Sequence, residues 1–351
     1  MSEFVTPPPL ESGGTLAIIA PSGGSAAGAR HIFELGLDRL DENFDLDVVV
    51  HPTARQSDTY LRSHPEARAA AIHEVFRDPD IDGVMATIGG DDQLRVLKHL
   101  DPEVLRSNPT RFFGLSDNTN LSLFLWNCGI VSYSGVQLMS EVATPGPFPE
   151  YTERYLRRAL FRETIGEIEP VDEWFDMTEP WDQSREAFAR STPDRHDGTG
   201  WKWVGSEEQV TGRVWGGCLS IVEWHLMTGR YLPDPKQLDG AVLALETSEV
   251  LPSADRVRYL LTCMGERGML QRFDGLLVGR PATETWIEGR SESEREEYRQ
   301  TQRETFLRQL ERYNPGATVV FDVDFGHTNP TFPLPVGSEV ELVPGERIVF
   351  H

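Results

Sequence analysis

Short apolar runs alternate with amphipathic stretches along the first 165 residues of the chain. Residues 16–20, 46–50, 83–88 and 130–134 form runs with the length of buried strands. Residues 26–40, whose apolar positions have helical spacing, follow the first run after a glycine-containing loop. Strands and helices that alternate in this way predict a mostly parallel sheet with helices on both faces. We therefore expect an N-terminal doubly wound α/β domain.

A similar alternation returns after residue 205. Strands are predicted at residues 210–215, 241–245, 275–279 and 317–323, and helices at residues 219–227, 253–264 and 292–313. The runs 339–343 and 347–350 alternate between apolar and polar residues and flank Pro344-Gly345, which predicts a hairpin. We place a C-terminal domain over these elements.

The stretch between the two domains has a different character. It holds charged and turn residues without a clear period, together with Trp174, Trp181, Trp201 and Trp203. Either these rings pack a long excursion onto the body of the protein, or they form an aromatic wall for a planar ligand. We therefore divide the chain into an N-terminal domain (1–165), a tryptophan-rich loop or linker (166–205) and a C-terminal domain (206–351).

Composition narrows the possible partners and the compartment. The formal net charge of −23 argues against nucleic acid or an anionic membrane surface as a partner. The three cysteines are widely spaced and include no C-x-x-C pair, so we expect neither a disulfide framework nor a zinc site. No run approaches the ~20 apolar residues of a membrane span, and the start lacks a basic, apolar leader. We expect a cytoplasmic protein.

The stretch from Arg111 to Asn120 carries the strongest chemical signal. Apolar residues lead into Ser116, polar residues follow it, and a second apolar run begins at Leu121. This pattern predicts a strand, a sharp turn and a helix, with the Ser116 hydroxyl at the carboxyl end of the strand. Such a turn presents a nucleophile beside unpaired backbone N–H groups. The alternative is a serine that caps a core helix.

Two glycine loops precede this turn. Gly89-Gly90 follows the predicted strand 83–88, so its backbone can approach a ligand closely and supply oxyanion donors. We expect this loop to meet Ser116 at one crevice, although an ordinary tight turn is the alternative. Residues 21–24 resemble a phosphate-binding turn, but they lack both G-x-G-x-x-G and a P-loop lysine. We therefore predict no cofactor and no metal.

Two further polar residues end or closely follow apolar strands. Glu246 closes the run 241–245, and His327 stands in a glycine-bearing turn after 317–323. A serine needs a base to take its proton, and that base needs an acid to orient it. His327 is the best base among the histidines, and Glu246 is preferred over Glu249 as the acid because it stands at the strand end.

These motifs carry a family resemblance. The serine LD-carboxypeptidases resemble this chain in Gly89-Gly90-Asp91, Gly114-Leu-Ser116-Asp117-Asn-Thr119, Leu245-Glu246-Thr-Ser and Gly326-His327-Thr. The chain is most similar to the branch of microcin C immunity peptidases. That branch is indicated by the pair Trp174 and Trp181, by Gly200-Trp-Lys-Trp203, by Gly212-Arg-Val-Trp-Gly-Gly-Cys-Leu219, by Leu245-Glu-Thr-Ser-Glu249 and by Gly275-Leu-Leu-Val-Gly-Arg-Pro281.

The resemblance implies a fold, an assembly and a set of catalytic roles. It implies that a C-terminal α/β domain with a β-rich core follows the doubly wound domain, and that the enzyme is a homodimer. Ser116, His327 and Glu246 map onto the catalytic triad. The backbone N–H groups of Asp117 and of the Gly89-Gly90 turn, which we assign to Gly90, map onto the oxyanion hole.

Two substrates follow from the resemblance. One is the amide that joins an aspartyl group to a modified adenylate, and the other is an L–D amide of a murein tetrapeptide with terminal D-alanine. In the first case the closest match for an aromatic residue that stacks on adenine is Trp181, with Trp174 second. Gly89 and, as a phosphate partner, Arg280 complete the expected substrate-binding set. A non-catalytic binding module on the same scaffold is the remaining alternative.

Overall fold

Five parallel strands form the centre of the N-terminal part in the computed structural model, which describes residues 4–285 and 288–351. Their order is β5-β4-β3-β1-β2, and β15 from near the C-terminus adds to β5 in the antiparallel sense. The strands are β1 (Thr15–Ile19), β2 (Asp47–Val50), β3 (Gly83–Ala86), β4 (Arg111–Gly114), β5 (Ser132–Ser134) and β15 (Leu334–Val336). The mostly parallel sheet expected from the sequence is thus confirmed.

Helices cover both faces of this sheet. Successive side chains of β1 enter two different hydrophobic clusters, Leu16 with Ile32 and Phe33 on one face and Ala17 with Ile72 on the other. Alternate residues of a strand point to opposite faces, so both faces are buried. The helices are α1 (Arg30–Phe44), α2 (Asp58–Ser63), α3 (Pro65–Arg77), α4 (Pro102–Ser107), α5 (Thr119–Asn127) and α6 (Glu150–Phe161). This arrangement is a doubly wound α/β domain.

An eight-stranded sheet forms the C-terminal part, with the order β6-β17-β16-β10-β11-β12-β13-β9. Its centre, from β10 to β13, is parallel, and the predicted hairpin is present as β16 and β17. The strands from this part of the chain are β10 (Val210–Cys218), β11 (Ala241–Glu246), β12 (Phe273–Gly279), β13 (Thr318–Val323), β16 (Glu339–Val343) and β17 (Arg347–Phe350). The helices are α8 (Leu219–Thr228), α9 (Ala254–Glu266) and α10 (Glu292–Tyr313).

The tryptophan-rich segment is more ordered than its pattern suggested. Its first and last strands extend the two edges of the C-terminal sheet, where β6 pairs with β17 and β9 pairs with β13. Its middle forms a small sheet with a strand that follows β13. The elements are β6 (Gly166–Ile168), β7 (Glu173–Asp176), α7 (Arg185–Ala189), β8 (His196–Asp197), β9 (Lys202–Val204) and β14 (Thr328–Asn329). These strands are short and pair with distant residues, so no local period reveals them.

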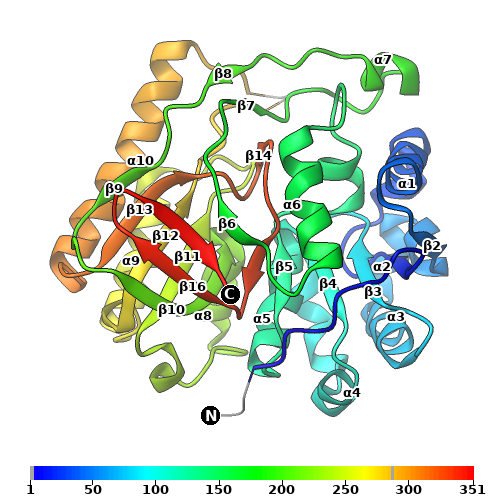
Figure 1. Cartoon of the computed structure of the whole chain (residues 1–351), viewed down its shortest axis with the longest axis horizontal. Coiled ribbons are helices and arrows are strands. Elements are labelled where there is room, and N and C mark those ends of the chain that lie inside the picture. Colours follow the sequence, from blue (N-terminus) through cyan, green and yellow to red (C-terminus); the bar gives the residue numbers. More distant parts are fainter. Residues whose placement is uncertain (1–3, 286–287) are drawn as a thin grey trace.

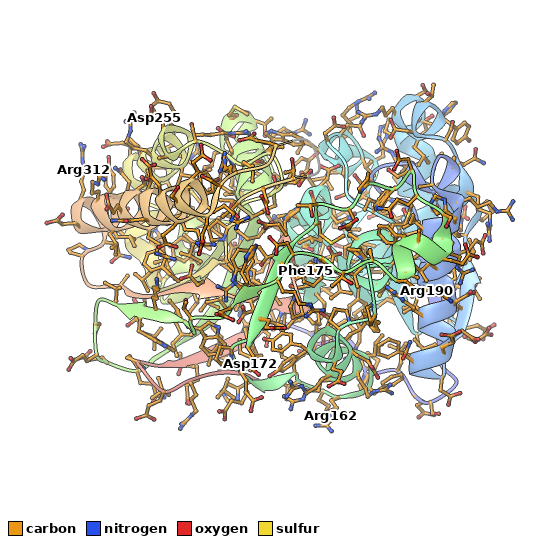
Figure 2. The ribbon with its side chains drawn as sticks, turned by 90° about the horizontal axis from the view of Figure 1, so that it is seen from above. Arg162, Asp172, Phe175, Arg190, Asp255 and Arg312 are labelled. Atoms are coloured by element: carbon orange, nitrogen blue, oxygen red, sulfur yellow. The ribbon has the colours of Figure 1, made fainter. Side chains whose placement is uncertain are left out.

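This segment runs across both parts of the molecule (Figure 1). In the view from above, Asp172 and Phe175 lie near the junction of the two parts, whereas Arg190 lies beyond it, over the N-terminal part (Figure 2). An ion pair between Arg185 and Asp38 fastens α7 to α1. Among the helices of the described residues, none has the length and apolar character needed to cross a membrane.

Candidate active site

Ser116 occupies a strained turn between β4 and α5. The chain leaves β4 at Gly114, and Ser116 adopts the left-handed conformation with φ of 62° before a single 3-10 turn (Ser116–Asn118) leads into α5. This conformation is unfavourable for a residue with a Cβ atom, and it turns the partly exposed side chain out of the strand path. Asn118 is the residue that precedes α5, and no side chain caps that helix. The helix-capping alternative for Ser116 is therefore wrong.

The Gly89-Gly90 loop lies directly against Ser116. A Cβ atom built on Gly89 would stand 2.7 Å from the Cβ of Ser116 and 3.1 Å from its Oγ, so only glycine fits. The Gly23 N–H donates to the Gly89 carbonyl at 3.0 Å, which ties the loops after β1 and β3 together. Within the described residues, the backbone N–H groups of Gly90 and Asp117 have no hydrogen-bond partner. One free donor thus belongs to the residue after Ser116, and the other to the residue after Gly89, which packs against the serine.

A buried carboxylate anchors the nucleophile turn. Asp117 is fully buried, and its Oδ2 accepts hydrogen bonds from the Ser22 hydroxyl and from the Gln93 backbone N–H at 2.8 Å. Its Oδ1 accepts a hydrogen bond from the Asn120 side chain at 2.8 Å. Burial raises the pKa of Asp117, although the hydrogen bonds from Ser22 and Gln93 oppose the shift. These bonds join the serine turn to the loops that follow β1 and β3.

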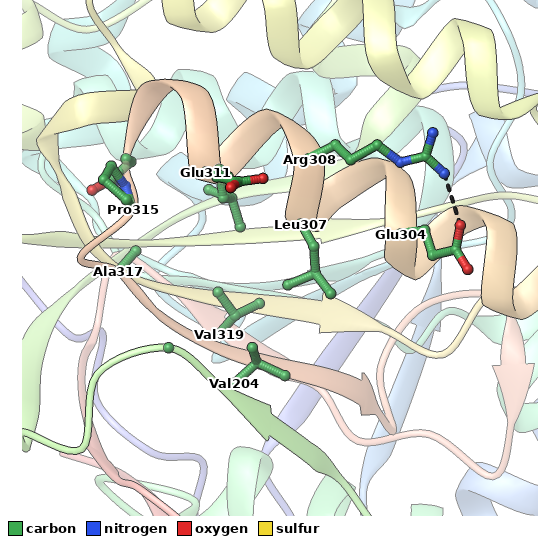
Figure 3. Close-up of a pocket in the computed structure, with 11 residues that line it drawn as sticks. Val204, Glu304, Leu307, Arg308, Glu311, Pro315, Ala317 and Val319 are labelled. Atoms are coloured by element: carbon green, nitrogen blue, oxygen red, sulfur yellow. Dashed lines mark hydrogen bonds and ion pairs between the residues drawn. The ribbon is translucent and has the colours of Figure 1, made fainter.

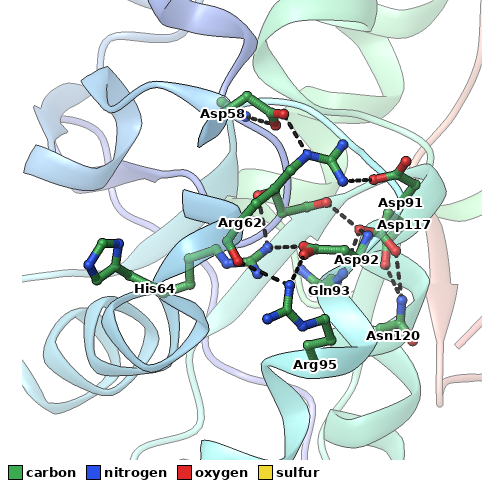
Figure 4. A network of polar contacts seen from close by, with 12 residues as sticks. Asp58, Arg62, His64, Asp91, Asp92, Gln93, Arg95, Asp117 and Asn120 are labelled. Carbon is green, nitrogen blue, oxygen red and sulfur yellow. Dashed lines mark hydrogen bonds and ion pairs between the residues drawn. The ribbon is translucent and has the colours of Figure 1, made fainter. Parts of the chain in front are cut away.

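Ion pairs extend this network toward the surface, as Figure 4 shows. Asp92, whose N–H also donates to Asp117, pairs with the buried Arg68 at 2.6 Å and with Arg95 at 2.9 Å. Arg62 bridges Asp58 and Asp91 on the exposed side. These ion pairs hold Asp91 and Asp92, the two residues that follow Gly89 and Gly90 in the loop.

Sequence reasoning missed a second buried carboxylate, Glu141. It lies in a π-helical turn (Leu138–Val142), where it accepts hydrogen bonds from the Ser140 hydroxyl at 2.7 Å and the Gln137 N–H at 3.1 Å. The Gln137 side chain in turn accepts from Leu115 N at 3.3 Å and Asn118 Nδ2 at 3.1 Å. Burial raises the pKa of Glu141 to about 7. Neither a motif nor a strand end marks Glu141 in the sequence.

The nucleophile turn docks onto the C-terminal sheet. Thr119 Oγ1 accepts a hydrogen bond from the Cys218 N–H at 3.1 Å, and Asn120 Oδ1 lies 2.9 Å from His225 Nε2. Cys218 ends β10 and stands in register with Glu246 at the end of β11. The start of α5 therefore contacts the end of β10, next to the strand end that carries Glu246.

Glu246 and His327 are in direct contact. Nδ1 of His327 donates to Oε2 of Glu246 at 2.6 Å, and the Glu246 side chain is 1% exposed. Gly326 makes this approach possible, since a Cβ there would lie 2.7–2.9 Å from Glu246 side-chain atoms, and its φ is 108°. Glu249 is not the partner of Nδ1. Its Oε2 lies 3.2 Å from Nε2, the other ring nitrogen of His327.

Carboxylates surround the imidazole and control its charge. Burial alone would lower the pKa of His327, but Glu246, Glu249 and Glu141 together raise it to about 9. The ring is therefore an imidazolium near neutral pH in this conformation. Nε2 of His327 is paired with Glu249, and no hydrogen bond joins it to Ser116 Oγ among the described residues.

The expected ligand-binding residues differ in accessibility. Trp181 is partly buried and packs against the main core cluster. Trp174 is 2% exposed, with the guanidinium groups of Arg280 and Arg299 over its ring at 5.3 and 5.2 Å. Arg280 forms a buried ion pair with Asp324 at 2.7 Å. In this conformation, Trp174 and Arg280 hold the segment 166–205 onto the body. The charge of Arg280 is paired with Asp324, and guanidinium groups cover the ring of Trp174.

Two other features lie outside this site. Ligand atoms of Asp194, His196 and Glu284 lie within 4.8 Å of one another, but Glu284 is already paired with Arg295 at 2.9 Å. A groove between α10 and the strands β9 and β13, shown in Figure 3, is lined by residues such as Leu307 and Val319 and includes none of the residues around Ser116. Neither feature offers a nucleophile with a base.

Family models match both the N-terminal and the C-terminal part of the chain. The LD-carboxypeptidase N-terminal domain model matches residues 16–135, and the LD-carboxypeptidase C-terminal domain model matches residues 211–342. The Microcin C7 self-immunity protein MccF of Escherichia coli is 24% identical over 277 residues, which are 78% of this chain and 77% of MccF. A Probable murein peptide carboxypeptidase of Bacillus subtilis is 28% identical over 174 residues, 49% of this chain and 52% of that protein.

Solved structures extend the similarity over the full length. An MccF-like protein from Streptococcus pneumoniae in complex with AMP has a TM-score of 0.84 at 26% identity, covering 96% of this chain and 98% of that chain. MccF in complex with aspartyl sulfamoyl adenosine has a TM-score of 0.83 at 21% identity, covering 99% of this chain and 98% of the MccF chain. The chain therefore belongs to the LD-carboxypeptidase family of serine hydrolases, in its MccF-like branch.

Proposed function

We propose that this protein is a serine amidase that cleaves the amide of a peptidyl or aminoacyl nucleotide through an acyl-enzyme. Ser116 is the nucleophile, His327 the base and Glu246 the acid of the triad. The observation that carries the proposal is the left-handed Ser116, which follows β4 and packs against Gly89. The contact between Glu246 and His327 supports it from the neighbouring sheet.

In the proposed mechanism, Ser116 Oγ attacks the scissile carbonyl while Nε2 of His327 accepts its proton. The carboxylate of Glu246 fixes the imidazole through Nδ1 and stabilises the imidazolium. The N–H groups of Gly90 and Asp117 stabilise the oxyanion. His327 then returns the proton to the leaving amine, and a water molecule, deprotonated by the same nitrogen, hydrolyses the ester on Ser116.

Two observations support a substrate that contains a nucleotide: the ligands of the relatives, and the tryptophan-rich segment 166–205, which we propose as the substrate loop. One MccF-like relative binds AMP, and MccF binds aspartyl sulfamoyl adenosine. We propose that Trp181 stacks on the base, because Trp174 is enclosed in the core. The second candidate is a murein tetrapeptide that releases terminal D-alanine, which the similarity to the murein peptide carboxypeptidase favours.

Purified enzyme incubated with each substrate separates these two functions. We expect an aminoacyl sulfamoyl adenosine to be cleaved, with release of the amino acid and the sulfamoyl nucleoside, and a murein tetrapeptide to be cleaved slowly or not at all. Release of D-alanine at the higher kcat/KM would instead establish the murein reaction. Ser116→Ala should abolish both reactions, and Ser122→Ala, which removes a buried hydroxyl without a partner, should retain them.

Trp181→Ala tests the stacking contact. Base–aromatic stacking contributes ~1–3 kcal/mol, so KM for the nucleotide substrate should rise by roughly 5- to 150-fold while the murein reaction is unaffected. Trp203→Ala, which removes another partly buried tryptophan of the same segment, is the matched control. Equal effects of both substitutions would remove Trp181 from the proposal.

We also propose that the enzyme is a homodimer, as the resemblance to the family implies. We place it in the cytoplasm, because aminoacyl nucleotides are made inside cells. Sedimentation at micromolar concentration tests the assembly: a dimer mass supports it and a mass of 39.5 kDa contradicts it. A binding module without catalysis would retain AMP but leave every substrate intact.

A further inference from the structure

Both nitrogens of the proposed catalytic base are occupied in this structure. Nδ1 of His327 contacts Glu246 at 2.6 Å, and Nε2 contacts Glu249 at 3.2 Å. A base in a serine hydrolase needs Nε2 free to accept the proton of the nucleophile. The described part of the chain shows no hydrogen bond on Ser116 Oγ, and the proton-accepting nitrogen of His327 is paired with a carboxylate.

We propose that Glu249 is a positioning residue that holds His327 as a resting imidazolium and must leave Nε2 before Ser116 can transfer its proton. This inference rests on the proposed function, since it assigns a purpose to a contact on the proposed base. The substrate displaces the Glu249 carboxylate when it enters the crevice, so the base becomes competent only in the occupied site.

The two carboxylates differ in the way this proposal requires. The Glu246 side chain is 1% exposed at the end of β11, and Gly326 packs directly against it. The Glu249 side chain is 62% exposed, lies in the loop between β11 and α9, and makes no ion pair with a described residue other than His327. Glu246 is therefore fixed, whereas Glu249 can rotate into solvent at little cost.

Three acidic groups face the imidazole from three elements. Glu246 stands at the end of β11, Glu249 in the following loop and Glu141 in the π-helical turn after β5. All three favour the charged ring, and Glu249 is the one on the reacting nitrogen. Removing its charge leaves the other two in place, so the ring stays oriented and becomes easier to deprotonate.

Glu249→Gln tests this role through two pH titrations. The first follows the His327 ring by NMR in the resting enzyme, with His327→Gln to assign the signal, and it needs no activity. The second follows the rate at which a fluorophosphonate probe labels Ser116. We expect both midpoints to fall by about 0.5–1 pH unit, which makes labelling at pH 7 roughly three- to tenfold faster. Asp255→Asn, an exposed acid at the start of α9, is the control.

The possible outcomes decide between the alternatives. Unchanged midpoints in Glu249→Gln, or a shift of the same size in Asp255→Asn, would overturn the inference. Slower labelling with an unchanged midpoint would also overturn it, because Glu249 would then act on ligand binding alone. If the probe labels no Ser116 in the wild type at any pH, the proposed function fails, while the NMR midpoint still shows whether Glu249 controls the charge of His327.

Discussion

Oε2 of Glu246 lies 2.6 Å from Nδ1 of His327, although the two residues are 81 positions apart in the sequence. Each stands just beyond or at the end of a strand in the parallel centre of the C-terminal sheet. The carboxyl ends of parallel strands lie at one edge, so the topology brings acid and base together. In the proposed mechanism this contact orients the ring.

Glu246→Gln should lower kcat by roughly 10³–10⁴-fold, because a neutral amide does not stabilise the imidazolium and can donate to Nδ1, which favours the wrong tautomer. Steady-state kinetics on the preferred substrate measure this effect. Glu246→Asp, which keeps the charge on a shorter side chain, should lose less. A Glu246→Gln enzyme within tenfold of the wild-type kcat would remove Glu246 from the triad.

The activity of the free enzyme should increase as pH rises toward 9. His327 must be neutral to accept a proton, and its pKa is raised to about 9 by the surrounding carboxylates. The acid limb of kcat/KM should therefore lie near this value. An acid limb near 6.5, the ordinary pKa of histidine, would mean that the carboxylates do not act on the base.

The same shift predicts a loss of stability at high pH. A raised pKa stabilises the folded state fully below the unfolded value of about 6.5, and this contribution disappears as pH rises through about 9. The loss is on the order of 3 kcal/mol. Urea unfolding between pH 6 and pH 10 measures it, and His327→Gln should flatten the slope. Equal slopes in both proteins would contradict the charged resting state.

Gly89→Ala should impair catalysis without unfolding the protein. The added methyl group would stand 2.7 Å from the Cβ of Ser116, so the serine or the loop with Gly90 must shift. Displacing one oxyanion donor costs roughly 10²–10³-fold in kcat. Gly316→Ala, where a Cβ meets nothing within 4 Å, is the control and should retain full activity. The idea fails if both variants turn over at the wild-type rate.

Asp117→Asn should destabilise the fold by roughly 2–4 kcal/mol. The amide would turn one donor toward a site where Ser22, Asp92 and Gln93 all donate, which leaves buried groups unpaired. Thermal unfolding measures the loss. Asp91→Asn, which removes an exposed carboxylate from the same network, should change stability by less than about 1 kcal/mol.

The sequence predicted the strands and helices that position the site, because their apolar periods are local. It also placed Ser116, Glu246 and His327 at strand ends, and the structure brings the last two into contact. Their catalytic roles remain predictions. The sequence left Glu246 and Glu249 as alternatives for one role, but in the structure Glu246 contacts Nδ1 of His327 and Glu249 contacts Nε2.

Other features depend on contacts that no local pattern encodes. Arg280 was expected to meet a phosphate, but Asp324 and Trp174 enclose it in the interior. Glu141 gave no signal, because its environment comes from residues that are distant in the chain. β15 joins the N-terminal sheet although it lies near the end of the chain, a pairing that only the folded topology determines.

Covalent labelling tests directly whether Ser116 is an activated nucleophile. Wild-type enzyme would be treated with a fluorophosphonate probe at pH 9, digested and examined by mass spectrometry, beside Ser116→Ala and Ser122→Ala. We expect one adduct on Ser116 in the wild type and in Ser122→Ala, and none in Ser116→Ala. An unlabelled Ser116 in an enzyme that still hydrolyses its substrate would contradict this expectation.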